Sequence, residues 1–124
     1  MTIDRRSKIL AVDDTPDNLF LIEAVFSEEV YHIISAESGE VALKLAQQHL
    51  PDLILLDIMM PGMNGYEVTR LIRQNPKTVD IPILLLTARS EAVASKGLLA
   101  GANGILYKPF DIDELISRTR VMLS

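Results

Sequence analysis

The segment 51–65, PDLILLDIMMPGMNG, constrains the fold of this chain more than any other stretch. Four consecutive apolar residues run directly into Asp57, and a short apolar run bounded by turn residues is typical of a strand buried on both faces. Proline, glycine and asparagine follow, which indicates a loop. Because ligands of open parallel α/β sheets bind beyond the carboxyl ends of the strands, Asp57 is predicted at the mouth of a site. The simpler alternative is a carboxylate that only satisfies backbone N–H groups of the loop.

Length and composition restrict the class of protein. The chain has 124 residues, 48% apolar and 23% charged, which suits one globular domain with its own core. It has no cysteine, which excludes disulfide and thiol chemistry. The net charge of −5 argues against non-specific nucleic-acid binding. No apolar run approaches the ~20 residues that span a bilayer, and the N-terminus does not resemble a signal peptide. We therefore expect a cytoplasmic protein without nucleic-acid or membrane partners.

Apolar runs alternate with helix-like segments along the whole chain. Short apolar runs predict five strands, at 8–12, 32–36, 52–57, 83–86 and 104–107. Capping residues and helical periodicity predict five helices, which start near Thr15, Ser38, Asn64, Ser90 and Asp111. Crossovers between parallel strands are right-handed, so helices should cover both faces of one sheet. The predicted fold class is α/β, a doubly wound five-stranded parallel sheet with five helices.

Two of the predicted helices carry features that bear on function. The first helix, which should end near Ser27, has Phe20 and Leu21 in excess of one core stripe. These two residues form either a docking surface for a partner or additional core. The fourth helix is rich in alanine and contains Gly97, so we expect it to be the least stable helix.

The predicted core positions of the last two helices follow from their apolar spacing. In the fourth helix, the few large apolar anchors are Val93, Leu98 and Leu99. In the last helix, Ile112 and Leu115 begin the apolar face that should pack against the sheet. Acidic residues lead the last helix and arginines follow, which is the order that the helix dipole favours.

Polar residues stand at the ends of four of the five predicted strands. Asp13 and Asp14 follow the first strand, Asp57 ends the third, Thr87 the fourth and Lys108 the fifth. The carboxyl ends of parallel strands share one edge of the sheet, so these side chains are expected to lie together. Each alone is explained more simply as a cap, a turn hydroxyl or a solvated charge. Polar residues at four strand ends of the same edge favour a site.

Three neighbouring carboxylates have a specific chemical consequence. They repel one another by roughly 1 to 4 kcal/mol per close pair, depending on the local dielectric constant. Either a proton or a cation must relieve this repulsion. Oxygen ligands without nearby histidine or cysteine suit Mg²⁺, which keeps waters for a phosphate. With Lys108 as a positive charge and Thr87 as a hydroxyl donor, the set suits a phosphoryl group on a carboxylate.

The chain resembles the receiver domains of two-component response regulators. The resemblance covers essentially all of residues 1–124, and four segments carry it: AVDDTPDN at 11–18, LILLDIMMPGMNGYE at 53–67, LLLTA at 84–88 and ILYKPF at 105–110. It implies one receiver domain with a flavodoxin-like fold and the strand order 2-1-3-4-5. These motifs together are highly specific for the family.

The resemblance also implies roles for individual residues. Asp57 would be the phosphoryl acceptor, Thr87 would bond a phosphoryl oxygen, and Lys108 would pair with it. The bond between Lys108 and Pro109 would be cis, which is uncommon because only ~5–6% of X-Pro bonds take this form.

The same resemblance implies a metal site. Mg²⁺ would be held by Asp13, Asp14 and Asp57 together with the backbone carbonyl of Met59. Asp14 would act either directly or through water. These residues would form the acidic pocket around the acceptor, and Mg²⁺ is the cofactor that the sequence leads us to expect.

One position departs from the family pattern. Receiver domains usually have an aromatic residue three positions before the lysine, and its inward swing reports phosphorylation. Here that position is Ile105, and Tyr107 lies two residues further on the same face of the strand. Tyr107 either takes over this role or only covers an edge strand, so both residues are switch candidates.

The resemblance implies a phosphorylation-controlled signalling switch. Its phosphoryl donor would be a sensor histidine kinase or a histidine phosphotransfer protein, and its output would be altered binding to a downstream protein that the sequence does not identify. It would not be an enzyme beyond catalysing its own phosphorylation and dephosphorylation. The sequence leaves a homodimer open.

Three alternatives are less consistent with the residues. An aspartate-based phosphatase would have D-x-D-x-T after the first strand, where this chain has Asp13, Asp14 and Thr15. A flavodoxin-like flavin binder needs a first loop that cradles a phosphate, and the acidic DDTPDN would repel one without a metal. A degenerate receiver that acts only as a docking module would not require the complete acidic set with Thr87 and Lys108.

Overall fold

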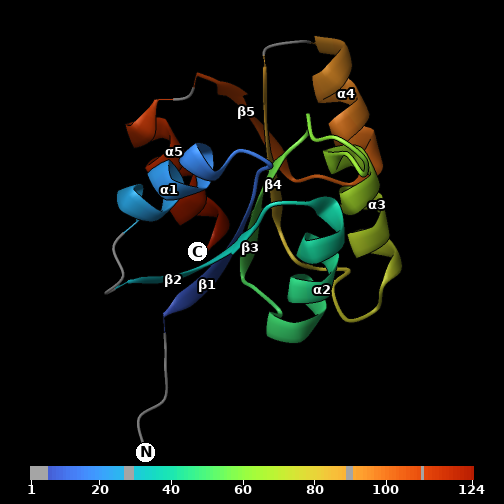
Figure 1. The fold of residues 1–124 in the computed structure, drawn as a ribbon, viewed down its shortest axis with the longest axis horizontal. Coiled ribbons are helices and arrows are strands. Elements are labelled where there is room, and N and C mark those ends of the chain that lie inside the picture. The colour runs from blue at the N-terminus through green and yellow to red at the C-terminus, as the bar shows by residue number, and fades with distance from the viewer. Residues whose placement is uncertain (1–5, 27–29, 89–90, 110) are drawn as a thin grey trace, which may run out of the picture.

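The computed structural model describes residues 6–26, 30–88, 91–109 and 111–124, and of residues 88 and 91–94 only the backbone. Strands and helices alternate along the chain (Figure 1). The strands are β1 (Ser7–Val12), β2 (Tyr31–Ala36), β3 (Leu53–Asp57), β4 (Ile83–Ala88) and β5 (Gly104–Lys108). The helices are α1 (Pro16–Val25), α2 (Gly39–His49), α3 (Gly65–Gln74), α4 (Glu91–Ala100) and α5 (Ile112–Met122). Among the residues described, no helix is long and apolar enough to cross a bilayer.

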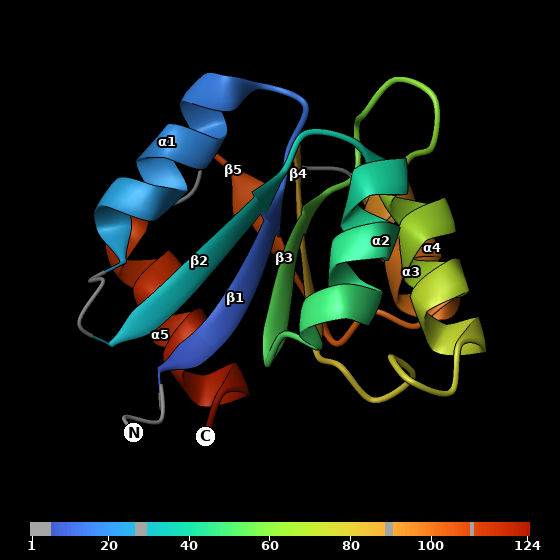
Figure 2. The ribbon, with the colours of Figure 1, turned by 60° about the horizontal axis from the view of Figure 1, so that its bottom comes forward.

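The five strands form one parallel sheet in the order β2-β1-β3-β4-β5. Helices α1 and α5 cover one face, and α2, α3 and α4 cover the other (Figures 1 and 2). The predicted doubly wound sheet and its strand order are confirmed. Strand β3 lies at its centre, so its carboxyl end opens between the two helical layers.

The unbroken apolar run of β3 is explained by burial on both faces. Every residue from Leu53 to Asp57 is buried. Leu53 and Leu55 pack in the core beneath α1 and α5, whereas Ile54 and Leu56 pack in the core beneath α2, α3 and α4. Alternate side chains of one strand thus serve two cores, so every position is apolar until the strand reaches Asp57.

The predicted helix caps are confirmed in three helices. Ser38 accepts a hydrogen bond from the backbone N–H of Val41, and Asn64 accepts one from Glu67. Asp111 accepts from two backbone N–H groups of the first turn of α5. At α1, Thr15 occupies the N-cap position without a side-chain hydrogen bond to the helix. Helix α1 therefore starts without a side-chain cap, unlike these three helices.

Two predictions about core positions are wrong. Leu98 and Leu99 do not anchor α4, because their side chains are 52% and 88% exposed. The cause is Gly97, which faces the sheet so closely that a Cβ there would lie 2.5 Å from a methyl carbon of Leu85. This contact sets the rotation of α4 and leaves both leucines on its outer side. Gly101 follows the helix with φ +115°, a backbone conformation that favours glycine.

In α5, Ile112 is also exposed, at 46%, although its spacing predicts a core position. It lies in the first turn, and the core contact of the helix begins one turn later at Leu115, which is fully buried. Ser27 and Ser90, where helix ends were predicted, and the side chain of Val93 lie outside the described residues.

Arg73 links α3 to the loops at the far end of the sheet. Its guanidinium donates to the backbone carbonyls of Gly101, Val79 and Ile81 at 2.9, 3.0 and 2.7 Å, and to Oδ1 of Asn103 at 2.7 Å. Burial lowers the pKa of Arg73, an effect that the nearby Asp80 carboxylate opposes. The residue therefore ties the loop before β4 to the turn after α4.

Candidate functional site

Strand alternation brings three of the predicted site residues to one side of the sheet. Asp13, Asp57 and Lys108 each stand two positions after an apolar residue that packs beneath α1 and α5. Those apolar residues are Ala11, Leu55 and Leu106. Since strands β1, β3 and β5 all end at the same edge, the two carboxylates and the ammonium converge there.

The charged groups are within contact distance. Nζ of Lys108 lies 3.2 Å from Oδ2 of Asp13 and 3.4 Å from Oδ1 of Asp57. One carboxylate oxygen from each of Asp13, Asp14 and Asp57 lies within 4.8 Å of the others. Asp13 and Asp57 are buried, whereas Asp14 is exposed. The structure therefore assembles the predicted acidic pocket with its lysine.

Asp13 is held by the start of α1 as well as by the lysine. Its Oδ1 accepts a hydrogen bond from the backbone N–H of Thr15 at 2.9 Å, and its Oδ2 accepts one from Nδ2 of Asn18 at 3.1 Å. The buried carboxylate thus holds the N-cap residue and one side chain of the first turn of α1, although it accepts from no backbone N–H inside the helix. Sequence analysis missed Asn18; its position one turn into the helix that follows the acidic pair is the signal that indicates it.

The pKa of Asp57 is raised above its ordinary value, chiefly because the carboxyl is buried. The negative charge of Asp13 raises it further. Lys108 and the backbone N–H of Met59, which donates to Oδ1 of Asp57 at 3.3 Å, act in the opposite direction. The protein alone thus does not fully compensate a negative charge on Asp57, and a bound cation would.

Helix α3 starts directly against the segment that follows Asp57. The backbone N–H of Gly65 donates to the carbonyl of Ile58 at 3.0 Å. A Cβ at Gly65 would lie 2.7 Å from the Cα of Ile58 and 2.8 Å from the carbonyl oxygen of Asp57. Only glycine allows this approach, which folds residues 58–64 into a loop beside the acceptor. Sequence analysis identified this glycine as a turn residue but not its contact with Asp57.

Thr87 is buried at the same edge of the sheet but belongs to the neighbouring strand. In the register of β3 and β4, Asp57 pairs with Leu86, so Thr87 stands one residue beyond the level of Asp57. Thr87 pairs with Tyr107 of β5. Thr87 and Lys108 are the penultimate and last residues of their strands rather than loop residues.

Ile105 and Tyr107, the two switch candidates, differ in their surroundings. Ile105 packs on the core beneath α2, α3 and α4, and its Cδ1 lies 3.6 Å from the position of a Cβ on Gly97. Tyr107 is half-buried on β5, which forms an edge of the sheet. On β5, an isoleucine rather than an aromatic ring thus faces α4, and the ring of Tyr66 lies at a similar distance from Gly97.

The surface next to the acidic pocket carries both apolar and charged side chains. Asn18, Leu21, Lys108 and Pro109 line a hollow beside the acidic pocket. Leu21 is 41% exposed, and the neighbouring Phe20 is 73% exposed. Both residues that exceed the core stripe of α1 are therefore on the surface. The peptide bond between Lys108 and Pro109 is cis, the isomer that the resemblance implies.

The donor set fits a hard divalent cation. Asp13, Asp14 and Asp57 offer carboxylate oxygens and no softer ligand, which is the type of donor set that Mg²⁺ prefers. Burial is the main cause of the raised pKa of Asp57, and the negative charge of Asp13 adds to it. With Lys108 beside two of the carboxylates, the pocket can hold both a cation and an anionic group.

Comparison with protein-family models matches residues 9–120 to the response regulator receiver domain. Among curated relatives, the response regulator PleD of Caulobacter vibrioides is 43% identical over 117 residues, covering 92% of this chain and 25% of that protein. Protein PilH of Pseudomonas aeruginosa is 32% identical over 119 residues, which cover 95% of this chain and 98% of PilH. The chain thus spans about a quarter of PleD but nearly all of PilH.

Solved structures agree with these matches. A putative response regulator from Chloroflexus aurantiacus has a TM-score of 0.91 and 37% identity, covering 96% of this chain and 98% of that one. The receiver domain of sensor histidine kinase PA1611 from Pseudomonas aeruginosa, solved with a magnesium ion coordinated in its active site cleft, has a TM-score of 0.87 and 33% identity, covering 95% and 98%. The chain therefore belongs to the response regulator receiver domain family.

Proposed function

We propose that Asp57 is the phosphoryl acceptor of this phosphorylation-controlled signalling switch. The observation that carries the proposal is the position of its buried carboxylate, with Lys108 at 3.4 Å and two further carboxylates within 4.8 Å. Asp13 cannot easily replace it, because Asn18, Lys108 and the backbone of Thr15 all bind its oxygens. The phosphatase alternative is not favoured.

We assign Asp13, Asp14 and Asp57, with the backbone carbonyl of Met59, as the ligands that would hold Mg²⁺. The chemistry of their oxygens supports this proposal, as does the magnesium ion in the related PA1611 receiver. Bound there, Mg²⁺ would supply positive charge to the transferring group.

The remaining groups have complementary roles in phosphoryl transfer. A carboxylate oxygen of Asp57 forms the bond to phosphorus, and the bond from phosphorus to the donor breaks with its electron pair leaving on the donor. Lys108 pairs with an oxygen of the transferred group, and Thr87 donates a hydrogen bond to another. The pocket catalyses this transfer and its later hydrolysis, and no other enzymatic activity is proposed for this chain.

We propose that the phosphoryl donor is a sensor histidine kinase or histidine phosphotransfer protein of the cytoplasm. Leu21 supports a docking role for α1, because it is exposed and lines the hollow that Lys108, a neighbour of Asp57, also lines. Phe20 faces another hollow, on the side of β2, although it precedes Leu21 directly. Leu21 is therefore the stronger candidate for contact with the donor.

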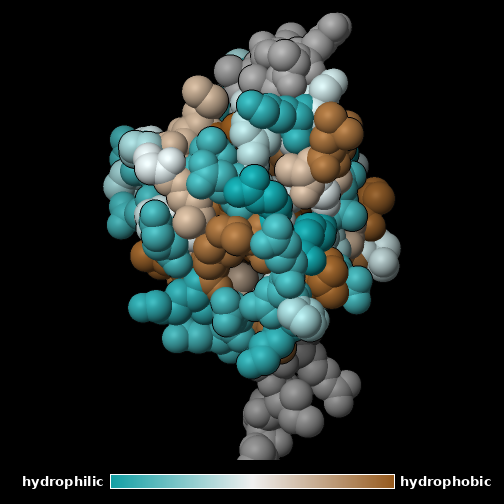
Figure 3. Space-filling model, turned by 90° about the vertical axis from the view of Figure 1, so that its right-hand side faces the viewer, coloured by the Kyte–Doolittle hydropathy of each residue, from teal (hydrophilic) through white to brown (hydrophobic). Residues whose placement is uncertain are grey.

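For the output, we propose that phosphorylation acts through Thr87 on β5 and α4. Leu98 and Leu99 make the outer side of α4 apolar. Figure 3 views the molecule from the side of α3 and α4, where apolar side chains form separate patches among hydrophilic ones. A change in α4 would alter this surface and the binding of a downstream protein. Ile105 or Tyr107 would be displaced with it.

Labelling with a small-molecule donor tests the acceptor. Acetyl phosphate with Mg²⁺ should add one acid-labile phosphoryl group, detected as a mass increase that disappears after acid treatment. Asp57→Asn should abolish it, whereas Asp17→Asn, which changes an exposed acid in the first turn of α1, should not. Labelling of the Asp57→Asn variant at the native rate would refute the assignment.

Two adjacent substitutions test the docking surface. Leu21→Ala should slow phosphoryl transfer from the cognate histidine kinase or phosphotransfer protein about tenfold if Leu21 is one of the few hot-spot residues, since these lose more than 1 kcal/mol of binding when truncated and 1.4 kcal/mol is tenfold. Phe20→Ala should have a smaller effect. Labelling by acetyl phosphate should be unchanged in both. An equal loss of rate with both donors would show that Leu21 only supports the pocket.

A further inference from the structure

Asn18 reaches from the first turn of α1 towards the acidic pocket. Its backbone N–H donates to the carbonyl of Thr15 at 3.0 Å, which fixes the residue at the start of the helix. Its side-chain Nδ2 donates to Oδ2 of Asp13 at 3.1 Å, and the residue lines a hollow together with Lys108. The amide of Asn18 therefore lies beside both a carboxylate and the lysine of the site.

Two donors share the buried Oδ2 atom of Asp13. One is the amide of Asn18, and the other is Nζ of Lys108 at 3.2 Å. Since a carboxylate oxygen offers about two lone-pair positions, these two donors fill it. The other oxygen, Oδ1, accepts from the backbone N–H of Thr15. Asp13 is only 1% exposed, so little water is available to replace either donor on Oδ2.

Lys108 is attracted by two carboxylates at once. Besides its contact with Asp13, its ammonium lies 3.4 Å from Oδ1 of Asp57, the proposed phosphoryl acceptor. A phosphoryl group on Asp57 adds anionic oxygens, which compete with Asp13 for the three N–H donors of the ammonium. A shift of Lys108 towards that group removes one of the two donors from Oδ2 of Asp13. A buried charged oxygen without a donor is unfavourable, and this penalty opposes the shift.

We propose that Asn18 is a positioning residue, which keeps Oδ2 of Asp13 hydrogen-bonded while Lys108 turns to the phosphoryl group. This role rests on the proposed function, because it requires Asp57 as the acceptor and Lys108 as the partner of the transferred group. Asn18 acts through Asp13 and Lys108 and not on the reacting atoms. A neutral amide suits the role, since a second cation here would reduce the negative charge that attracts Mg²⁺.

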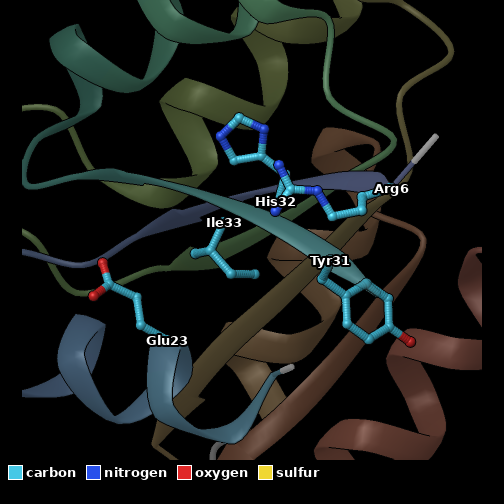
Figure 4. A pocket seen from close by; sticks show the side chains of 5 residues that line it. All are labelled: Arg6, Glu23, Tyr31, His32 and Ile33. Atoms are coloured by element: carbon cyan, nitrogen blue, oxygen red, sulfur yellow. The ribbon is translucent and has the colours of Figure 1, made fainter. Parts of the chain in front are cut away.

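The rate of labelling by acetyl phosphate at saturating Mg²⁺ tests this role. Asn18→Leu, which keeps a side chain of similar size without a donor, should slow labelling about tenfold, because a hydrogen bond to a charged group is worth about that factor. Glu23→Leu is the matched control on the same helix. Glu23 accepts a hydrogen bond from Oγ of Ser35 at 2.6 Å in a separate hollow beside β2 (Figure 4), so this variant should label at the native rate.

A double-mutant cycle in EDTA gives a second readout, which needs neither Mg²⁺ nor phosphorylation. Either donor alone can satisfy Oδ2 of Asp13, so losing Asn18 should matter most when Lys108 is also missing. We expect Asn18→Leu to lower the melting temperature by about 4 °C more in a Lys108→Met background than in the native chain. A residue that only supports α1 would lower it equally in both. If the Lys108→Met variant does not fold, the labelling comparison decides by itself.

Three results would overturn the role of Asn18. One is native labelling of Asn18→Leu by acetyl phosphate, including the case in which only transfer from a protein donor is slowed, because Asn18 would then contact the donor. The others are equal slowing in Glu23→Leu and equal shifts in both backgrounds, which would show general support of α1. Native labelling of Asn18→Leu while Asp57→Asn stays unlabelled rejects this role alone, whereas labelling of Asp57→Asn at the native rate rejects the proposed acceptor.

Discussion

Replacing Asp57 with asparagine should stabilise the protein when no divalent cation is present. At an effective dielectric constant of about 20, Lys108 at 3.4 Å attracts the carboxylate by about 5 kcal/mol. Asp13 and Asp14, each within 4.8 Å, repel it by about 3 kcal/mol or more, although solvent weakens the share of the exposed Asp14. Burial adds to the repulsion, and the raised pKa of Asp57 shows that the unfavourable contributions are larger. A neutral side chain of the same shape should therefore raise the free energy of unfolding, by about 1.4 kcal/mol for each pH unit that separates the native pKa from the unfolded one.

Thermal unfolding in EDTA measures this gain, with an expected rise in melting temperature of about 4 °C per kcal/mol for a chain of this size. The pKa of Asp57 is raised on folding, so the folded state binds this proton more tightly than the unfolded state. The gain should be complete above the native pKa and should disappear as the pH falls below the ordinary pKa of 3.8, where the carboxyl is protonated in both states. Mg²⁺ at ten times its Kd should stabilise the native chain by about 1.4 kcal/mol, and the Asp57→Asn variant by less.

Two results would refute this electrostatic account. One is an Asp57→Asn variant in EDTA that is no more stable than the native chain at neutral pH. The other is a stability gain that persists unchanged at low pH, because it would then come from packing rather than from charge. A melting curve of the native chain that does not respond to millimolar Mg²⁺ would separately argue against a cation site at the three carboxylates.

Substitutions at three further positions test how the site is built and connected. Thr87→Ala should leave Asp57 phosphorylatable. Beryllofluoride, a phosphoryl mimic, should change hydrogen exchange at residues 91–107 in the native protein but not in this variant. An equal change in both proteins would exclude a route through Thr87. Gly65→Ala should cost about 1–3 kcal/mol and slow labelling by acetyl phosphate, since the added Cβ must displace backbone atoms of Asp57 and its neighbour. Arg73→Leu should lower the free energy of unfolding by about 2–4 kcal/mol in denaturant titrations, because it leaves part-buried carbonyls unpaired, and Arg73→Lys should recover only part of the loss.

The sequence by itself determined the fold class and the place of the site. Strand periodicity is local information, and an apolar run such as 53–56 must be buried on both faces wherever it occurs. Because parallel strands end at one edge, the positions of Asp13, Asp57 and Lys108 at their strand ends were enough to predict that they meet. The caps at Ser38, Asn64 and Asp111 could also be predicted from the sequence, since each depends on a hydrogen bond between residues that are close in sequence.

Tertiary structure alone decided which way each helix faces and how the site residues are held. The rotation of α4 depends on the contact of Gly97 with Leu85, so periodicity could not show that Leu98 and Leu99 are exposed. Likewise, the surplus of apolar residues on α1 did not show that the side chain of Leu21 lines the hollow beside Lys108. These features arise from packing between segments far apart in sequence. Local helix and strand propensities do not predict such contacts.

The carboxylates show the same division between local and tertiary information. Their identity and spacing predicted an acidic pocket, but the sequence did not show that Asn18 and Lys108 bind Asp13. The direction of the pKa shift of Asp57 likewise depends on burial and on distances of a few ångströms to charges on other strands. Sequence therefore determined which groups are present at the edge of the sheet, and only the tertiary structure decided their distances, burial and protonation, because these depend on how separate segments pack.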